Sequence, residues 1–203
     1  TLRFSLSALA LATVLGLTHA VAARHSVGLR ASAFLPFVVS PVTVAFGLLL
    51  LYPQWTASLS LLLAAYALLA YPFVAKSVGS ALDSLPAHLE QAARSLGASS
   101  WRCFWRVTLP LVAPALRRGM AFAAATSLGE FAVTLFLSRP EWQTLTTLIY
   151  HYLGLPGADN RDQAMVLSFV LMALALAVIA ANAWFFYQDY ASFFRNKIGR
   201  AHV

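Results

Sequence analysis

The stretch EQAARSLGASSWRCFWRVTLP, residues 90–110, stands out from the rest of the chain. Long apolar runs precede and follow it, whereas it holds four charged side chains and two tryptophans. Gly97 lies near its middle and Pro110 at its end. Glycine commonly ends helices and proline cannot continue one. The segment therefore predicts two short helices joined by an elbow, outside the apolar part of the protein.

The first of these helices is predicted from apolar residues at helical spacing: Leu85, Leu89, Ala92, Ala93 and Leu96. Glu90 and Arg94 are four residues apart, in the order that favours a surface ion pair. Ser99 or Ser100 can cap the second helix. Its aromatic residues Trp101, Phe104 and Trp105 predict one exposed aromatic face. Such a face suits either a lipid surface or a protein partner, and the residues alone favour neither.

The composition points to a membrane protein. Of 203 residues, 60% are hydrophobic and only 10% are charged, whereas soluble domains have about a quarter charged. The formal net charge is +7, but the basic residues lie between apolar runs, which argues against nucleic-acid binding and favours a membrane face. Because the segment 197–203 can be back-translated into a sequencing-adapter string, we interpret it as a non-native read-through tail.

The apolar runs predict an all-α membrane protein with about five spans in one membrane domain, residues 1–196. A span needs about 20 apolar residues. The predicted spans are Phe4–Ala23, Ala33–Tyr52, Thr56–Ala75, Gly119–Leu137 and Ala164–Tyr187. Prolines 36, 41 and 72 predict kinks, and the fourth helix can begin nearer Pro110.

Lysine and arginine set the expected orientation. They are concentrated after the first, third and fifth spans, whereas residues 138–163 carry more acidic than basic side chains. The loop of about residues 76–110 is therefore expected on the cytoplasmic side of the membrane.

The string QAARSLGASSWRCFWRVTLP resembles the EAA loop of permease subunits of type I ABC importers. The match comprises Gln91-Ala92-Ala93, then Gly97, then Val107, and Leu109-Pro110. The departure is Gln91, where the family usually has glutamate; Glu90 directly precedes it. The segment SLGEFAVTLFLSRPEWQTLTTLIYHYLG, residues 127–154, is similar to permeases for thiamine, iron(III), sulfate and molybdate.

The resemblance implies a transport subunit that couples to a separate ATPase. The loop would dock on an ATPase dimer, and the expected coupling residues are Glu90, Gln91, Ala92, Ala93, Gly97, Trp101, Leu109 and Pro110. It also implies a second permease domain, an extracytoplasmic solute-binding protein and the lipid bilayer as partners, and a location in a bacterial or archaeal plasma membrane. No cofactor or metal is expected. The predicted substrate is of the thiamine or iron(III) type before sulfate or molybdate, with this chain as the C-terminal half of a duplicated permease.

Glu130 is the acidic residue predicted deepest in a span, and Ser127 precedes it by almost one turn. An intramembrane carboxylate is costly, so Glu130 is expected either to line the translocation path or to support helix packing. Two other functions compete with the importer reading. One is a stand-alone proton-coupled carrier that uses Glu130, and the other is a membrane-embedded enzyme.

Overall fold

The computed structural model describes residues 2–55, 58–137 and 139–198, and within these residues every regular element is a helix. This confirms the all-α fold class. Of the predicted tail, 197–203, only the first two residues fall in the described part, at the end of the last helix. The elements are α1 (Leu2–Ala22), η1 (Ala23–His25), α2 (Val27–Ser32), α3 (Leu35–Val38), α4 (Pro41–Leu51), η2 (Pro53–Trp55), α5 (Leu59–Ser84), α6 (Ala87–Ser95), α7 (Ser100–Cys103), η3 (Phe104–Thr108), α8 (Leu109–Gly129), α9 (Ala132–Leu137), η4 (Pro140–Trp142), α10 (Leu145–Leu153) and α11 (Ala158–Ile198).

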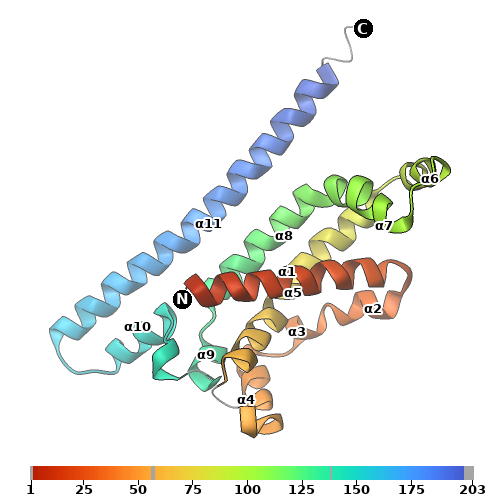
Figure 1. The fold of residues 1–203 in the computed structure, drawn as a ribbon. Coiled ribbons are helices and arrows are strands. Elements are labelled where there is room, and N and C mark those ends of the chain that lie inside the picture. The colour runs from red at the N-terminus through yellow and green to blue at the C-terminus, as the bar shows by residue number, and fades with distance from the viewer. Residues whose placement is uncertain (1, 56–57, 138, 199–203) are drawn as a thin grey trace.

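The core is a bundle in which α1 and α8 both pack on α5. Figure 1 shows α1 crossing α5 obliquely while α8 runs beside it. A small buried residue recurs every four positions on α1, as Ala8, Ala12, Gly16 and Ala20. The same spacing recurs on α8, as Ala115, Gly119, Ala123 and Ser127. Small residues at this spacing let helix backbones approach closely in membranes.

Two glycines mark where the approach is closest. A Cβ added at Gly16 would lie 2.5 Å from the Cβ of Val74, and one added at Gly119 would lie 2.8 Å from the Cα of Val74. Both helices therefore contact the same residue of α5 with no room for a side chain. Val74 is fully buried between them.

Three described helices are long and apolar enough to cross a membrane: Leu2–His25, Leu59–Ser84 and Ala158–Gln188. They contain most of the first, third and fifth predicted spans. The second predicted span, Ala33–Tyr52, is not one straight helix, because the segments Val27–Val38 and Pro41–Leu51 meet at an angle of 97°. Val39 and Ser40 are extended, and Pro41 opens a new helix in its first turn.

The fourth predicted span, Gly119–Leu137, is wrong in its C-terminal boundary, whereas the expected alternative start near Pro110 is confirmed. The helix α8 begins at Leu109 and ends at Gly129, after which Glu130 adopts an extended conformation. At about 1.5 Å per residue, its 21 residues reach roughly 30 Å. Arg117 and Arg118 lie within α8, and it is not among the three helices that meet the apolar criterion for a span.

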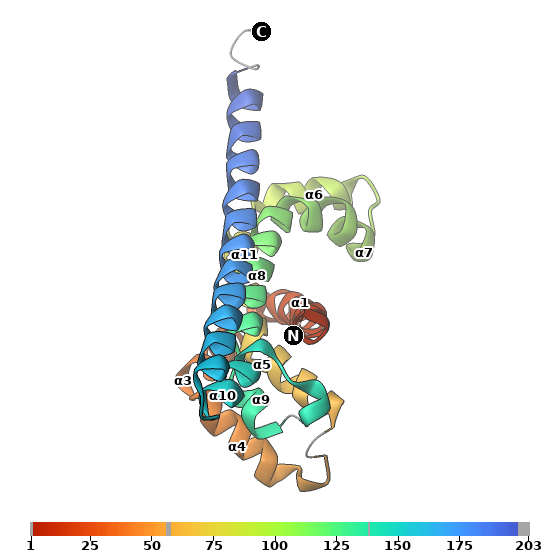
Figure 2. The ribbon, with the colours of Figure 1, turned by 90° about the vertical axis from the view of Figure 1, so that its left-hand side faces the viewer.

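The two ends of α8 lead into different structures. At its N-terminal end, α6 and α7 form a hairpin that projects sideways from the bundle, as Figure 2 shows. At its C-terminal end, α9 packs on α4 and α10 packs on α11, which then runs back past α8. The hairpin and the region around Glu130 thus lie at opposite ends of one helix.

Candidate coupling hairpin

The elbow between the two hairpin helices is a left-handed turn at Gly97. Its φ of 82° is a conformation that side-chain-bearing residues rarely adopt. The N–H of Gly97 donates to the oxygen of Arg94 at 2.9 Å, and the N–H of Ala98 donates to the oxygen of Ala93 at 3.1 Å. These two bonds form the Schellman motif, which satisfies carbonyls at the end of a helix. The predicted helix stop at Gly97 is confirmed.

The second hairpin helix starts where its cap predicts. The side-chain oxygen of Ser99 accepts a hydrogen bond from the N–H of Arg102 at 3.3 Å. Trp105 contacts both of its aromatic neighbours, with its ring centroid 5.4 Å from that of Trp101 and 5.7 Å from that of Phe104. The single π-helical turn η3 then leads into α8, where Pro110 occupies the first turn. Such π-turns are frequent at functional sites.

The hairpin exposes most of the predicted coupling residues. Gln91, Ala92 and Gly97 are exposed, and so is Trp101, with 71% of its surface accessible. Ala93 and Glu90 are half-buried, and Leu109 and Pro110 belong to the stem that enters α8. Leu96 is 89% exposed, although its spacing places it in the apolar stripe. Its position directly before the Gly97 elbow could have indicated exposure, because the chain leaves the helix there.

Glu90 does not form the predicted surface pair with Arg94. Its Oε1 lies 2.7 Å from Nη1 of Arg24, in the turn that follows α1. The hydroxyl of Thr108, at the end of η3, donates to the same oxygen at 3.1 Å. The hydrogen bond from Arg24 lowers the pKa of the Glu90 carboxyl group below its usual value, and Thr108 and the charges of Arg24 and Arg94 add to this effect against the opposing effect of burial. The carboxylate is therefore held inward, toward the base of the hairpin.

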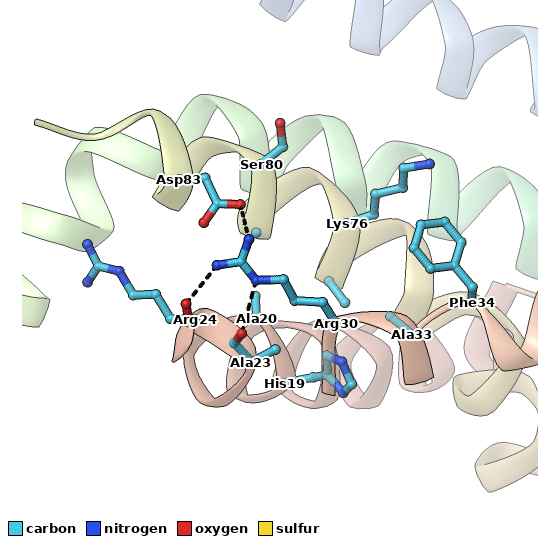
Figure 3. Close-up of a pocket in the computed structure, with 12 residues that line it drawn as sticks. His19, Ala20, Ala23, Arg24, Arg30, Ala33, Phe34, Lys76, Ser80 and Asp83 are labelled. Carbon is cyan, nitrogen blue, oxygen red and sulfur yellow. Dashed lines mark hydrogen bonds and ion pairs between the residues drawn. The ribbon is translucent and has the colours of Figure 1, made fainter. Parts of the chain in front are cut away.

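A second group of charges lies beside this base, in a cavity of about 230 Å³ between the end of α1, the segment α2–α3 and α5. Figure 3 shows the Arg30 guanidinium at its centre, with Arg24 extending away from it. The guanidinium of Arg30 donates to the carboxylate of Asp83 at 2.8 Å and to the backbone oxygens of Ala23 and Arg24. All three of its nitrogens are used. Arg30 thus serves to brace the turn after α1, and the cavity is not an open anion-binding site.

The second predicted site, at the far end of α8, forms a buried polar cluster. Glu130 is 8% exposed, and its Oε1 accepts the N–H of Val133 at 2.9 Å. It therefore caps α9, and the helix breaks at Glu130 instead of continuing through the fourth predicted span. Its backbone oxygen accepts hydrogen bonds from the hydroxyls of Tyr66 on α5 and Thr146 on α10. These contacts fix the break between α8 and α9.

Ser127 supports helix packing at the same end. It is 2% exposed, and its backbone oxygen lies 3.4 Å from the hydroxyl of Ser5 on α1. Its own hydroxyl is buried without a hydrogen-bond partner among the described residues. The side chain thus serves mainly as a small buried residue of the α8 stripe, at a point where α8 also contacts α1.

Comparison with known proteins identifies the family to which this chain belongs. Residues 7–188 match the family described as "Binding-protein-dependent transport system inner membrane component", and the chain belongs to that family. These proteins are transport subunits, in keeping with the expectation that the chain is not itself an enzyme. The fold is similar to a chain of the MetNI methionine ABC transporter in inward-facing conformations, with a TM-score of 0.72, 18% identity, and coverage of 90% of this chain and 89% of that chain.

Relatives with closer sequences carry the names of three transport systems. The molybdenum transport system permease protein ModB of Haemophilus influenzae is 37% identical over 111 residues, 53% of this chain and 48% of that protein. The sulfate transport system permease protein CysT of Escherichia coli K12 is 31% identical over 159 residues, 73% of this chain and 57% of that protein. The putative 2-aminoethylphosphonate transport system permease protein PhnV of Salmonella typhimurium is 31% identical over 150 residues, 72% of this chain and 56% of that protein.

The chain spans about half the length of these curated relatives. The names that they carry do not confirm the predicted thiamine or iron(III) group.

Proposed function

We propose that this chain forms part of the translocation path of an ATP-driven ABC importer in the plasma membrane, and that its α6–α7 hairpin docks on a separate ATPase dimer. The observation that carries the proposal is the hairpin, which projects from the bundle, exposes Leu96 and Trp101 and follows the EAA pattern. Exposed aromatic and aliphatic side chains of this kind are common anchors in protein interfaces. Family membership supports the same assignment.

The remaining partners follow from this role. A second permease domain would complete the path, and an extracytoplasmic solute-binding protein would deliver the solute to the end that holds α9 and α10. The hairpin would then face the cytoplasm, as the distribution of lysine and arginine favours.

The proposed substrate is a small oxyanion. The relatives' names include molybdenum, sulfate and a phosphonate, and the net charge of this chain is +7. A carboxylate that guides a cation through the path is not needed for such a substrate. Glu130 already caps α9, which supports a structural role for it.

Co-purification tests the docking proposal. The full-length protein, expressed with an ATPase subunit encoded beside it, is expected to retain that ATPase through purification. Leu96→Ser is expected to weaken the association at least ten-fold, because it removes an exposed apolar anchor. Leu153→Ser is the matched control, because Leu153 is also exposed, at 61%, but lies on α10 at the opposite end of α8. Equal retention in both variants would contradict docking through the hairpin.

Two further measurements test orientation and coupling. Ser95→Cys in a Cys103→Ser background offers an exposed thiol on α6, which a membrane-impermeant reagent is expected to reach only from the cytoplasmic side. Uptake of molybdate or sulfate into proteoliposomes is expected only with the ATPase, ATP and the binding protein present. Uptake without ATP would instead favour the stand-alone carrier.

A further inference from the structure

The hairpin has little packing of its own to hold it in place. No residue of α6 is buried, and within α7 the buried residue is Cys103. A helix pair with so little buried surface gains its direction from its attachments rather than from a core. The contacts at its base therefore decide the angle at which it meets any partner.

One carboxylate joins three elements at this base. Glu90 belongs to α6, Arg24 to the turn after α1, and Thr108 to the turn that enters α8. Both partners donate to the same oxygen, Oε1, at 2.7 Å and 3.1 Å. The side chains of Arg24 and Glu90 are only 25% and 22% exposed, and Thr108 is 3% exposed. Partial burial limits screening by water and salt, so this pair is stronger than an exposed one.

We propose that Glu90 is a positioning residue which, through Arg24 and Thr108, fixes the angle of the hairpin and passes its movement to α1. The proposal rests on the proposed function, in which the hairpin receives movement from an ATPase. It assigns Glu90 a role inside this chain, whereas the neighbouring Gln91 and Ala92 remain exposed for docking. Gly16 of α1 packs directly on Val74 of α5. A force on Arg24 therefore acts on a closely packed helix and not on a loose loop.

A second ion pair nearby provides a matched control. Arg30 and Asp83 also lie 2.8 Å apart, but each side chain is 46% exposed. This pair joins α2 to the end of α5, and neither residue belongs to the hairpin. Asp83→Asn thus removes one carboxylate charge while leaving in place the three side chains that meet at Glu90 Oε1.

Cys103 reports directly on the state of the hairpin base. It is the single cysteine of the chain and is 3% exposed. It lines a cavity of about 150 Å³ together with Arg24, Glu90 and Thr108. Opening of the base should expose its thiol, so the rate of its alkylation in the purified protein measures opening without any partner.

The first arm of the test is a mutant cycle on that rate. Glu90→Gln, Arg24→Gln and the double variant are each expected to raise the alkylation rate about three- to ten-fold, by the same factor, because the two residues act as one unit. Asp83→Asn is expected to leave the rate within two-fold of wild type, about the scatter of an additive site. The proposal would be contradicted if the effects of the two single substitutions on the alkylation rate multiply in the double variant, or if no variant changes the rate.

The second arm is the coupling ratio of the assembled transporter. Glu90→Gln is expected to keep the ATPase bound but to lower the number of solutes moved per ATP several-fold, whereas Asp83→Asn keeps the wild-type ratio. Loss of ATPase binding with unchanged Cys103 alkylation would place Glu90 on the docking surface and overturn the proposal. If the wild-type protein binds no ATPase, the proposed function fails. The rate of Cys103 alkylation still decides whether Glu90 and Arg24 together hold the base of the hairpin closed.

Discussion

Gly119 in the bundle and Gly97 in the hairpin are both required to be glycine, but for different physical reasons. A Cβ at Gly119 would lie 2.8 Å from the backbone of Val74, whereas a Cβ at Gly97 would meet nothing within 4 Å. Gly97 instead has a φ of 82°, which disfavours any side chain regardless of space. The bundle is thus held by close helix approach, and the hairpin by local backbone signals and the contacts of Glu90.

The largest expected effect comes from breaking the bundle at Gly119. Gly119→Leu would force α8 away from α5, and overpacking that shifts the backbone costs up to about 3 kcal/mol, occasionally more. The folded fraction in detergent, followed by size-exclusion chromatography and thermal unfolding, should fall strongly. Gly79→Ala is the control, because a Cβ on Gly79 of α5 meets nothing within 4 Å. Equal stability of the two variants would contradict close approach at Gly119.

The next-largest effect is expected at the break between α8 and α9, where only one of two substitutions of Glu130 should destabilise the protein. Glu130→Leu leaves the N–H of Val133 buried without its acceptor, at a cost of about 1–3 kcal/mol. Glu130→Gln keeps an acceptor oxygen and should retain stability and transport. Thermal unfolding and uptake of the two variants separate the roles. Failure of both would show that the charge itself is needed, against the capping role.

At Gly97 the expected effect is smaller and confined to the hairpin. Gly97→Val would cost about 1–2 kcal/mol, because a β-branched residue must occupy the left-handed region. Membrane insertion should stay normal while ATPase association and transport fall. Gly97→Asn tests the cause, since asparagine tolerates this region better and should lose less. Full transport by the valine variant would show that the elbow conformation is not required.

The smallest effect should come from acid titration of Glu90. Its pKa is lowered in the folded protein, so the stabilisation is fully present above the ordinary value of 4.5 and is lost as pH falls from there through the lower folded value. The charged groups that lower the pKa of Glu90 are Arg24 and Arg94. Cys103 reactivity, measured with a dipyridyl disulfide that reacts with thiols in acid, should differ between wild type and Glu90→Gln at pH 7.

That difference should disappear as pH falls below about 4.5, because protonation then removes the same charge that the substitution removes. A difference between the two proteins that persists unchanged to low pH would mean that the carboxylate charge is not what closes the hairpin base. Asp83→Asn again serves as the control, and should behave like wild type at every pH.

The sequence by itself determined the features whose causes lie within a few residues. Gly97 ends α6 and Ser99 caps α7, because turn conformations and caps depend on neighbours three to five positions away. Long apolar runs likewise predicted most of three spans, and the EAA pattern predicted the family. Span boundaries were predicted less well, since apolar residues continue across the breaks at Val39 and Glu130.

Only the tertiary structure decided how distant residues are paired. Glu90 had a correctly spaced partner four residues away in Arg94, yet it pairs with Arg24, 66 positions earlier in the chain. Glu130 was predicted from its burial cost, but its capping role depends on a helix break that hydropathy does not reveal. The Glu90 carboxylate pairs with the donor that the folded chain places nearest to it. The Glu130 carboxylate is tolerated in an apolar run because the helix break provides a backbone N–H that it can accept. Neither fact is present in local sequence, because both depend on which helices come together.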